Sequence, residues 1–313
     1  ETSKKYQVVG NSLFSDNVAE VKGIADKYYS DTFDKEREPF TGVRTIDPKF
    51  SKEISDAFDN LKDNPNDPEV KSAYNKMAEE SINQYKYLLD AGYSIEVNNT
   101  EPYNSSIEMM QDLKENKRMK IFSTESGFGD SPITQEQREN NPLLKDSGYK
   151  DVNGVPLLIN DIFRAVHDFF GHAELGNSFG PIGEENAWQV HARMFSPEAR
   201  KAMTTETRGQ NSYVNFSGIN KEVFKKRDKA RRLRREGKFE EADKLVEEVY
   251  SEMSFADQKI GILPDKYTTL ESKAQVIGDQ DLQDDIDRAR AKNKSITPDM
   301  MLRRSVYKGV DRF

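Results

Sequence analysis

The sequence predicts a mainly α-helical fold with a few short β-strands, an α+β arrangement in which a helical core carries the functional site. Three observations favour this class. Apolar residues recur at helical spacing over several segments, most clearly between Pro68 and Gly92. Alternating, β-branched segments are few and short. Seventeen Phe and 13 Tyr in 313 residues supply the large apolar groups that a core of this size needs.

Each helix is expected from its apolar spacing and its end signals. In the strongest, Pro68 occupies a first-turn position and Gly92 is a C-cap glycine. Asn160 and Asp161 are a good N-cap and a favourable first-turn acid for another helix. The expected helices cover residues 17–33, 51–61, 68–91, 105–115, 161–173 and 184–195, with a short one restarting at Ser196.

Short strands are expected at 93–97 and 119–122, where apolar and β-branched residues alternate. Residues 127–150 are rich in Gly, Pro, Asn and Asp, so we expect a long loop, either a lid over a site or a plain surface excursion. Residues 220–250 predict a helical hairpin turned at Gly237.

We divide the chain into an N-terminal helical segment (1–64), a metal-binding core domain (65–275) that includes the hairpin 220–252, and a polar C-terminal tail (276–313). The first residues lack the apolar stretch of a signal peptide, and no segment has the apolar length of a membrane span. We therefore expect an intracellular protein without membrane contact.

Composition limits the chemistry. The chain has no cysteine, which excludes disulfides, thiolate metal sites and cysteine nucleophiles. A metal here must use imidazole and carboxylate, ligands suited to Fe(II), Zn(II) or Mn(II). The net charge of −8 argues against broad nucleic-acid binding, except weakly through the basic helix 225–235. The acidic second arm of the hairpin favours reading that basic helix as a solvated face.

The three histidines, His167, His172 and His191, lie within 25 residues of one another. Histidine is the commonest metal ligand, so this clustering indicates a site. His167 and His172 are five residues apart, about 140° around an α-helix, and Gly171 between them permits close approach. We expect these two as metal ligands; the alternative is a pair of hydrogen-bonded core histidines. We expect His191 to be structural or supporting, although it remains a possible ligand.

The third ligand is expected to be a carboxylate. Indexing the helix 184–195 at about 100° per residue places Glu184 on the same apolar side as Trp188 and His191. A buried, unpaired carboxylate is costly, and a metal offsets that cost. Glu184 is therefore the first choice, and Glu206 the alternative. Glu184 pairing with Arg193 or Arg164 stays open.

The run Thr204 to Asn211 is a dense polar stretch between apolar segments, typical of a substrate-contacting loop or of a plain hydrogen-bonded loop. Arg208 is suited to clamping a carboxylate or phosphate, which also makes it a candidate catalytic residue. Asp168 and Glu185 are candidate general bases. The remaining candidate substrate contacts are Thr205, Gln210, Asn211 and Trp188.

The string from Asp161 to His172, with its core HDFFGH, resembles the iron-binding motif of the aromatic amino acid hydroxylases. That resemblance implies non-haem iron held by His167, His172 and a later glutamate, for which Glu206 is the nearest counterpart. This chain departs from the motif after the second histidine, where Ala173 replaces the family's proline.

A longer resemblance runs to a protein family found in phages and other mobile elements. The matching stretches span most of residues 65–265 and include GEENAW (183–188), TTETRGQNS (204–212) and ADQKIGILP (256–264). It implies a phage-related protein, located in a host cytoplasm or in a virion, rather than a particular reaction.

Together these patterns predict a mononuclear metalloenzyme with a two-His-one-carboxylate site, an Fe(II) oxygenase or hydroxylase acting on a small-molecule substrate. Two alternatives stay open. One is a Zn(II) hydrolase, and the other is a virion structural protein, associated with other virion proteins, with a structural or vestigial metal site.

Overall fold

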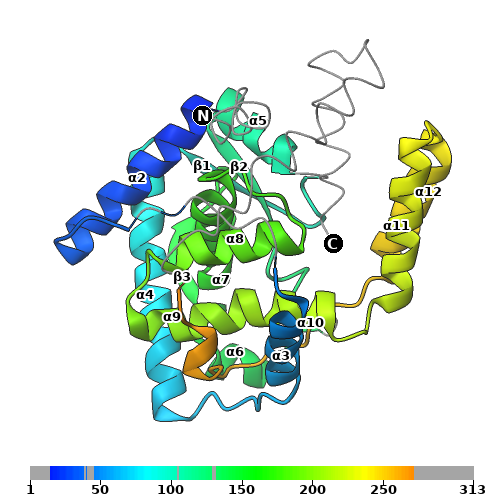
Figure 1. Cartoon of the computed structure of the whole chain (residues 1–313). Helices are drawn as coiled ribbons and strands as arrows, with labels where there is room; N and C mark the ends of the chain where they lie inside the picture. The colour runs from blue at the N-terminus through cyan, green and yellow to red at the C-terminus, as the bar shows by residue number, and fades with distance from the viewer. Residues whose placement is uncertain (1–14, 39, 41–45, 104–105, 129–131, 271–313) are drawn as a thin grey trace.

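The computed structural model describes residues 15–38, 40, 46–103, 106–128 and 132–270, and these form a mainly helical body with two small sheets (Figure 1). The predicted fold class is thereby confirmed. The proposed tail 276–313 lies outside the described residues. None of the described helices is long and apolar enough to cross a membrane.

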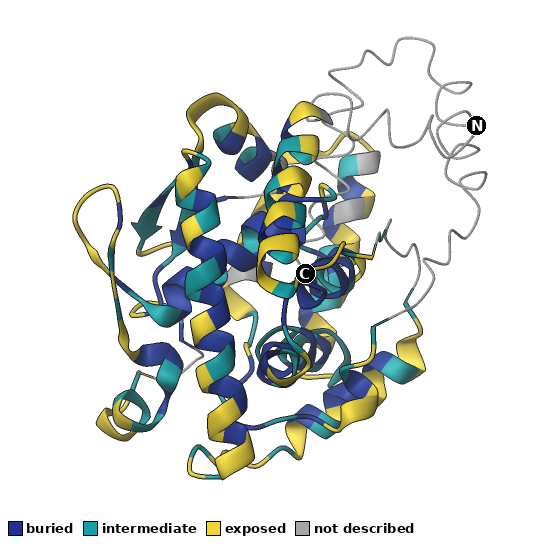
Figure 2. Ribbon diagram, turned by 90° about the vertical axis from the view of Figure 1, so that its left-hand side faces the viewer, coloured by how far each residue is buried: buried dark blue, intermediate teal, exposed yellow. Residues whose placement is uncertain are grey.

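The long helix α4 (Pro68–Asp90) is the central support of the body. Asp67 caps it by accepting from the backbone amides of Glu69 and Val70, and Pro68 begins it as expected. Its apolar side packs against α2 (Ser15–Phe33), α7 (Ile159–His167) and α9 (Pro197–Thr204). The resulting cluster of buried side chains is the main core of the protein. Along the helices, buried and exposed residues alternate as expected for amphipathic segments (Figure 2).

Helix α3 (Pro48–Asp59) packs against α10 (Gln210–Phe216) at the other side of the body. Its Ile54 and Phe58 form a second, smaller apolar cluster with Leu263 and Tyr267. Tyr267 belongs to the 3₁₀ turn Asp265–Tyr267. The segment 1–64 thus contributes helices to two different parts of the body.

The first sheet pairs β1 (Ser94–Asn98) with β2 (Arg118–Phe122) in parallel, and α5 (Ser106–Asn116) connects them. A helical crossover of this kind is what two adjacent parallel strands require. Both strands lie within two residues of their predicted positions. The second sheet pairs β3 (Asp146–Lys150) with β4 (Pro156–Leu158) in antiparallel fashion, directly before α7.

The predicted long loop at 127–150 is wrong in its second half. The helix α6 (Gln135–Asn140), the 3₁₀ turn Pro142–Leu144 and strand β3 occupy that part. A capping box starts α6, since Thr134 accepts from the amide of Gln137 and the Gln137 side chain accepts from the amide of Thr134. Asn141 and Pro142, which counted towards the loop prediction, are the N-cap and first residue of the 3₁₀ turn.

Helices α11 (Lys221–Arg235) and α12 (Phe239–Glu252) form the predicted hairpin, turned at Gly237 with φ of 80°. Figure 1 shows this hairpin standing away from the rest of the molecule. Two small apolar clusters hold its arms together. Charged pairs cross between the arms, for example Lys226 with Glu248 and Arg234 with Asp243. Part of the basic arm is thus paired within the hairpin itself.

Candidate metal centre

The start of α7 is fixed to the end of strand β2 through Asp161. Its carboxylate accepts from the backbone amide of Thr124 at 2.9 Å, from the Thr124 hydroxyl at 2.6 Å and from the amide of Leu158 at 2.9 Å. The helix begins at Ile159 with Leu158 at the N-cap position. The expectation that Asn160 is the N-cap is therefore wrong. Asn160 instead donates to the Thr124 hydroxyl. These buried bonds set the position from which the histidines project.

The helix changes its winding between the two candidate ligands. After His167 the chain continues as a π-helix, Asp168–Ala173, rather than as α-helix. A π-helix bonds residue i to i+5, so residues five apart lie close to one side instead of about 140° apart. The rings of His167 and His172 consequently approach to 5.3 Å between centroids, with their planes nearly perpendicular.

Helix α8 (Pro181–Ala192) brings the third candidate ligand to this pair. Gly171 allows it to come close, because a Cβ at residue 171 would lie 3.0 Å from the carbonyl oxygen of Ala187 on α8. Gly183 is still more restricted, since a Cβ there would lie 1.9 Å from the carbonyl oxygen of Ser178. The close approach that Gly171 predicted is thus to the backbone of a neighbouring helix.

Three side chains converge where these helices meet. Oε2 of Glu184 lies 3.5 Å from Nε2 of His172 and 4.0 Å from Nε2 of His167. One donor atom from each of the three residues lies within 4.8 Å of the others, and no other such group occurs among the described residues. Two donors on one ion, each at about 2.1 Å, lie at most about 4.2 Å apart. Both carboxylate–imidazole distances fit that limit, so the three residues are suited to holding a metal ion.

The charges of the group support one another. Burial raises the pKa of Glu184, but the His172 and His167 imidazoles outweigh it and lower this pKa to about 2. Burial lowers the pKa of His172, but the Glu184 carboxylate outweighs it and raises that pKa. A carboxylate held ionised beside two imidazoles is a donor set of nitrogen and oxygen, which suits first-row divalent metals.

His191 lies behind His167 rather than beside the carboxylate. Its Nδ1 is 3.2 Å from Nδ1 of His167, and its Nε2 is 2.7 Å from Oε1 of Gln84 on α4. The ring is fully buried, and burial together with the nearby charge of His167 lowers the pKa of His191 well below its usual value. His191 therefore supports His167 and is not a member of the candidate ligand group.

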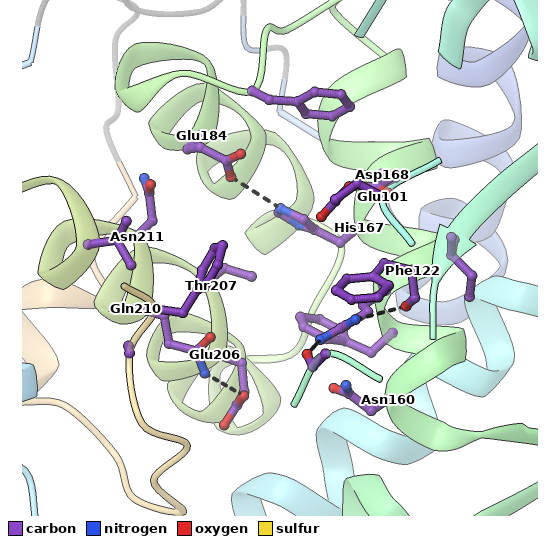
Figure 3. Close-up of a pocket in the computed structure, with 18 of the residues that line it drawn as sticks. Glu101, Phe122, Asn160, His167, Asp168, Glu184, Glu206, Thr207, Gln210 and Asn211 are labelled. Carbon is purple, nitrogen blue, oxygen red and sulfur yellow. Dashed lines mark hydrogen bonds and ion pairs between the residues drawn. The ribbon is translucent and has the colours of Figure 1, made fainter. Parts of the chain in front are cut away.

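A cavity of about 660 Å³ opens beside the candidate ligands. His167, Asp168 and Glu184 line one part of it, and Glu206, Thr207, Gln210 and Asn211 line another (Figure 3). Aromatic rings contribute to the wall, among them Tyr103, Phe122, Phe163 and Phe179. The cavity is thus large enough for a small molecule and gives it access to the candidate metal ligands.

Glu206, the alternative third ligand, lies away from Glu184 and His167 in Figure 3. Its carboxylate accepts from the hydroxyl of Tyr74 at 2.6 Å and from Nε2 of Gln210 at 2.9 Å. Burial raises the pKa of Glu206 to about 7, because these hydrogen bonds offset only part of the desolvation. Of the two carboxylates considered from the sequence, only Glu184 belongs to the group that can hold a metal.

The predicted polar loop 204–211 is wrong as a loop. The end of α9, a π-helix (Thr205–Gly209) and the start of α10 occupy it. Gln210 and Asn211 do line the cavity, as expected of substrate contacts, whereas Thr205 is fully buried outside it. Because the segment is helical, one of its sides is buried in the core and only the other side faces the cavity.

Arg208, Trp188 and the partly exposed Glu185 form a separate cluster outside the cavity. The guanidinium of Arg208 donates to both carboxylate oxygens of Glu185 at 2.9 and 2.7 Å and to the carbonyl oxygen of Tyr267 at 2.7 Å. It also stacks over the Trp188 ring at 4.0 Å. These contacts occupy the side chains that we expected as substrate anchor, general base and substrate contact, and they give the three residues an architectural role.

Asp168 lies next to His167 and lines the cavity, and burial raises the pKa of its carboxyl. It is the one sequence-predicted general base that the fold places beside the candidate ligands. Arg164, which sequence reasoning did not assign to the cavity, also lines it. Arg164 donates to the carbonyl oxygens of Phe122 and Gly127.

Sequence reasoning also missed Gln84. The available signal was its position on the apolar side of α4, between the buried residues Ser81 and Leu88. A buried amide on such a side requires a hydrogen-bond partner, and the partner here is His191.

Fold and site together define a mainly helical protein with a candidate His-His-Glu metal centre at the wall of a cavity. In comparisons with protein-family models, curated proteins and solved structures, nothing matched the chain.

Proposed function

We propose that this protein is a mononuclear metal-dependent enzyme, with His167, His172 and Glu184 as ligands and Fe(II) as the metal. The observation that carries the proposal is the convergence of two imidazoles and one carboxylate within 4.8 Å at a cavity wall. Ferrous iron in a two-His-one-carboxylate site keeps coordination positions open for dioxygen and substrate. The reaction class that fits best is therefore an oxygenation or hydroxylation of a small molecule.

The cavity supports a catalytic rather than a purely structural metal. Structural sites are closed by protein ligands, whereas catalytic sites keep an open side. Here His167 and Glu184 both contribute to the cavity wall, and the side chain of Glu184 is 24% exposed. The alternative is a phage virion protein with a structural or vestigial metal, which we propose second because of the resemblance to phage proteins. The open side of the site weighs against it.

The residues of the wall have separate tasks in this proposal. The aromatic rings of Phe163 and Phe179 exclude water on one side of the ligands, and the amides of Gln210 and Asn211 orient polar groups of the substrate. Glu206, whose pKa is about 7, holds a proton in part of the molecules at neutral pH and donates to or accepts from the substrate.

One observation favours a second candidate, a Zn(II) hydrolase. Asp168 lines the cavity directly beside His167, and burial raises the pKa of its carboxyl, which makes it a stronger base than an exposed aspartate. Zinc in such a site activates water for hydrolysis. Asp168 would then receive the proton of the attacking water and pass it to the leaving group.

Elemental analysis of protein purified without added metal tests the proposal. We expect about one iron per chain in the wild type and in Glu206→Gln, and its loss in Glu184→Gln and in the double variant His167→Ala/His172→Ala. Zinc in place of iron would move the assignment to the hydrolase. Metal content that survives these ligand substitutions, or is absent from the wild type even after Fe(II) or Zn(II) is supplied, would exclude the site.

A further inference from the structure

A line of hydrogen-bonding groups runs from α4 through α8 to α7. Oε1 of Gln84 lies 2.7 Å from Nε2 of His191, and Nδ1 of His191 lies 3.2 Å from Nδ1 of His167. The far nitrogen of His167, Nε2, then faces Glu184. Gln84 and His191 are both fully buried, so water cannot replace either partner.

The orientation of the Gln84 amide and the chemistry of the two rings together set where the protons are. With Oε1 of Gln84 facing the ring, Nε2 of His191 must carry a proton and donate it, because an amide oxygen only accepts. A neutral imidazole has one N–H and one lone pair, which leaves Nδ1 of His191 as an acceptor. Two ring nitrogens at hydrogen-bond distance need one proton between them, and it must therefore come from Nδ1 of His167.

We propose that Gln84 and His191 are positioning residues that hold the proton of His167 on Nδ1, so that the Nε2 lone pair faces Glu184 and His172. A histidine that binds metal must present an unprotonated nitrogen, and the hydrogen bond at its other nitrogen selects which one that is. The purpose of this arrangement rests on the proposed metal site, but the proton positions do not.

The surroundings of His191 keep it in this orientation. Its ring packs edge-on against Phe195, with centroids 4.9 Å apart, and lies parallel to Phe163 at 6.2 Å. A ring flip would place carbon atoms against Gln84 and His167, and both would lose their buried hydrogen-bond partner. Packing and hydrogen bonding therefore select the same orientation.

Nuclear magnetic resonance of metal-free protein with ¹⁵N-labelled histidine tests the proton positions directly. The chain has only three histidines, all at this site, so the imidazole spectrum contains only three rings. Single His→Gln variants assign them. At about pH 8, above the usual pKa of histidine, we expect His167 protonated on Nδ1 with Nε2 bare, and His191 protonated on Nε2. A proton on Nε2 of neutral His167 would overturn the proposal.

Titration with Zn(II) against a competing chelator tests whether Gln84 and His191 promote metal binding. We expect His191→Phe and Gln84→Met to weaken binding by about 10- to 100-fold, as for other residues that orient a metal ligand. Phe195→Leu is the packing control, because it removes the ring beside His191 without touching the hydrogen bonds. Wild-type affinity in His191→Phe would contradict the positioning role.

The two proposals fail in different ways. If the wild type binds neither Zn(II) nor Fe(II), the metal site is wrong, whereas the proton positions in the metal-free spectrum still decide the arrangement of Gln84, His191 and His167. If metal binds but His167 carries its proton on Nε2 in the metal-free protein, the metal site stands and the positioning role falls.

Discussion

Gly171 lies against Ala187, so close that a Cβ at residue 171 would be 3.0 Å from the Ala187 carbonyl oxygen. The same Cβ would be 3.2 Å from Nδ1 of His167. This single absent side chain lets α8 approach the π-helix and lets Glu184, one turn before Ala187, reach the histidines.

Replacing Gly171 with alanine should therefore separate the two helices. We expect a loss of about 1–3 kcal/mol in unfolding free energy, the usual cost of overpacking, despite alanine's better helix propensity. Metal affinity should fall as well, because Glu184 moves with α8. Chemical denaturation and metal titration measure the two effects.

Gly23 of α2 is the matched control, since nothing lies within 4 Å of a Cβ added there. Gly23→Ala should stabilise the protein by up to about 1 kcal/mol through helix propensity alone. Equal effects at the two glycines would show that the contact between Gly171 and Ala187 is unimportant.

Metal should stabilise the fold through Glu184. A ligand that binds only the folded state at 100 times its dissociation constant adds about 2.7 kcal/mol, which for this size corresponds to a rise of roughly 4–5 °C in melting temperature. We expect this rise for wild type and for Glu206→Gln, and none for Glu184→Gln. Differential scanning calorimetry with and without Fe(II) under argon measures it, and an equal rise in Glu184→Gln would place the metal elsewhere.

Glu206 should make the metal-free protein less stable as pH rises towards neutrality. Burial raises the folded-state pKa of its carboxyl from 4.5 to about 7, so its contribution is fully present below about pH 4.5 and is lost as pH passes 7. Each pH unit in that window costs at most about 1.4 kcal/mol from this group.

Urea denaturation at several pH values between 5 and 7.5 tests this effect. The Glu206→Gln variant keeps a side chain of the same shape without a titrating proton, so its stability should change less over this range than that of the wild type. The difference between the two proteins isolates Glu206 from other buried carboxyls such as Glu80 and Glu174, whose pKa values are also raised. Parallel curves for the two proteins would contradict the assignment.

Arg208→Met should destabilise the fold by about 3 kcal/mol, because it leaves the Glu185 carboxylate, whose side chain is 14% exposed, without its ion-pair partner. The double variant Arg208→Met/Glu185→Leu should recover much of that loss, since it removes both charges. A double-mutant cycle by chemical denaturation measures the coupling. If Arg208→Met left stability unchanged, a substrate-anchoring role for Arg208 would regain support.

Local patterns in the sequence predicted most of the helices and both strands of the parallel sheet. Apolar spacing and end signals such as Asp67-Pro68 and Gly92 are local, so they survive without knowledge of the fold. Errors fell where polar residues act as helix caps or lie in π-helical winding, at 127–150 and 204–211. Composition alone does not distinguish a loop from a polar segment that neighbouring helices hold in place.

By itself, the sequence determined which residue types could bind a metal and which residues were the candidate ligands. The absence of cysteine restricted a metal to imidazole and carboxylate, and the clustering of histidines pointed to His167 and His172. The periodicity of the next helix placed Glu184 on its inward side. Each of these inferences depends on residue chemistry or on the geometry of one helix, and both can be read along the chain.

Only the tertiary structure decided how these residues meet. The π-helix after His167 brings His167 and His172 to the same side, whereas an α-helix would separate them. It forms where Gly171 packs on α8. Gln84 reaches His191 from a helix more than a hundred residues away, and Arg208 is taken up by Glu185 instead of facing the cavity. Contacts between distant segments depend on the packing of the whole core, which no local pattern encodes.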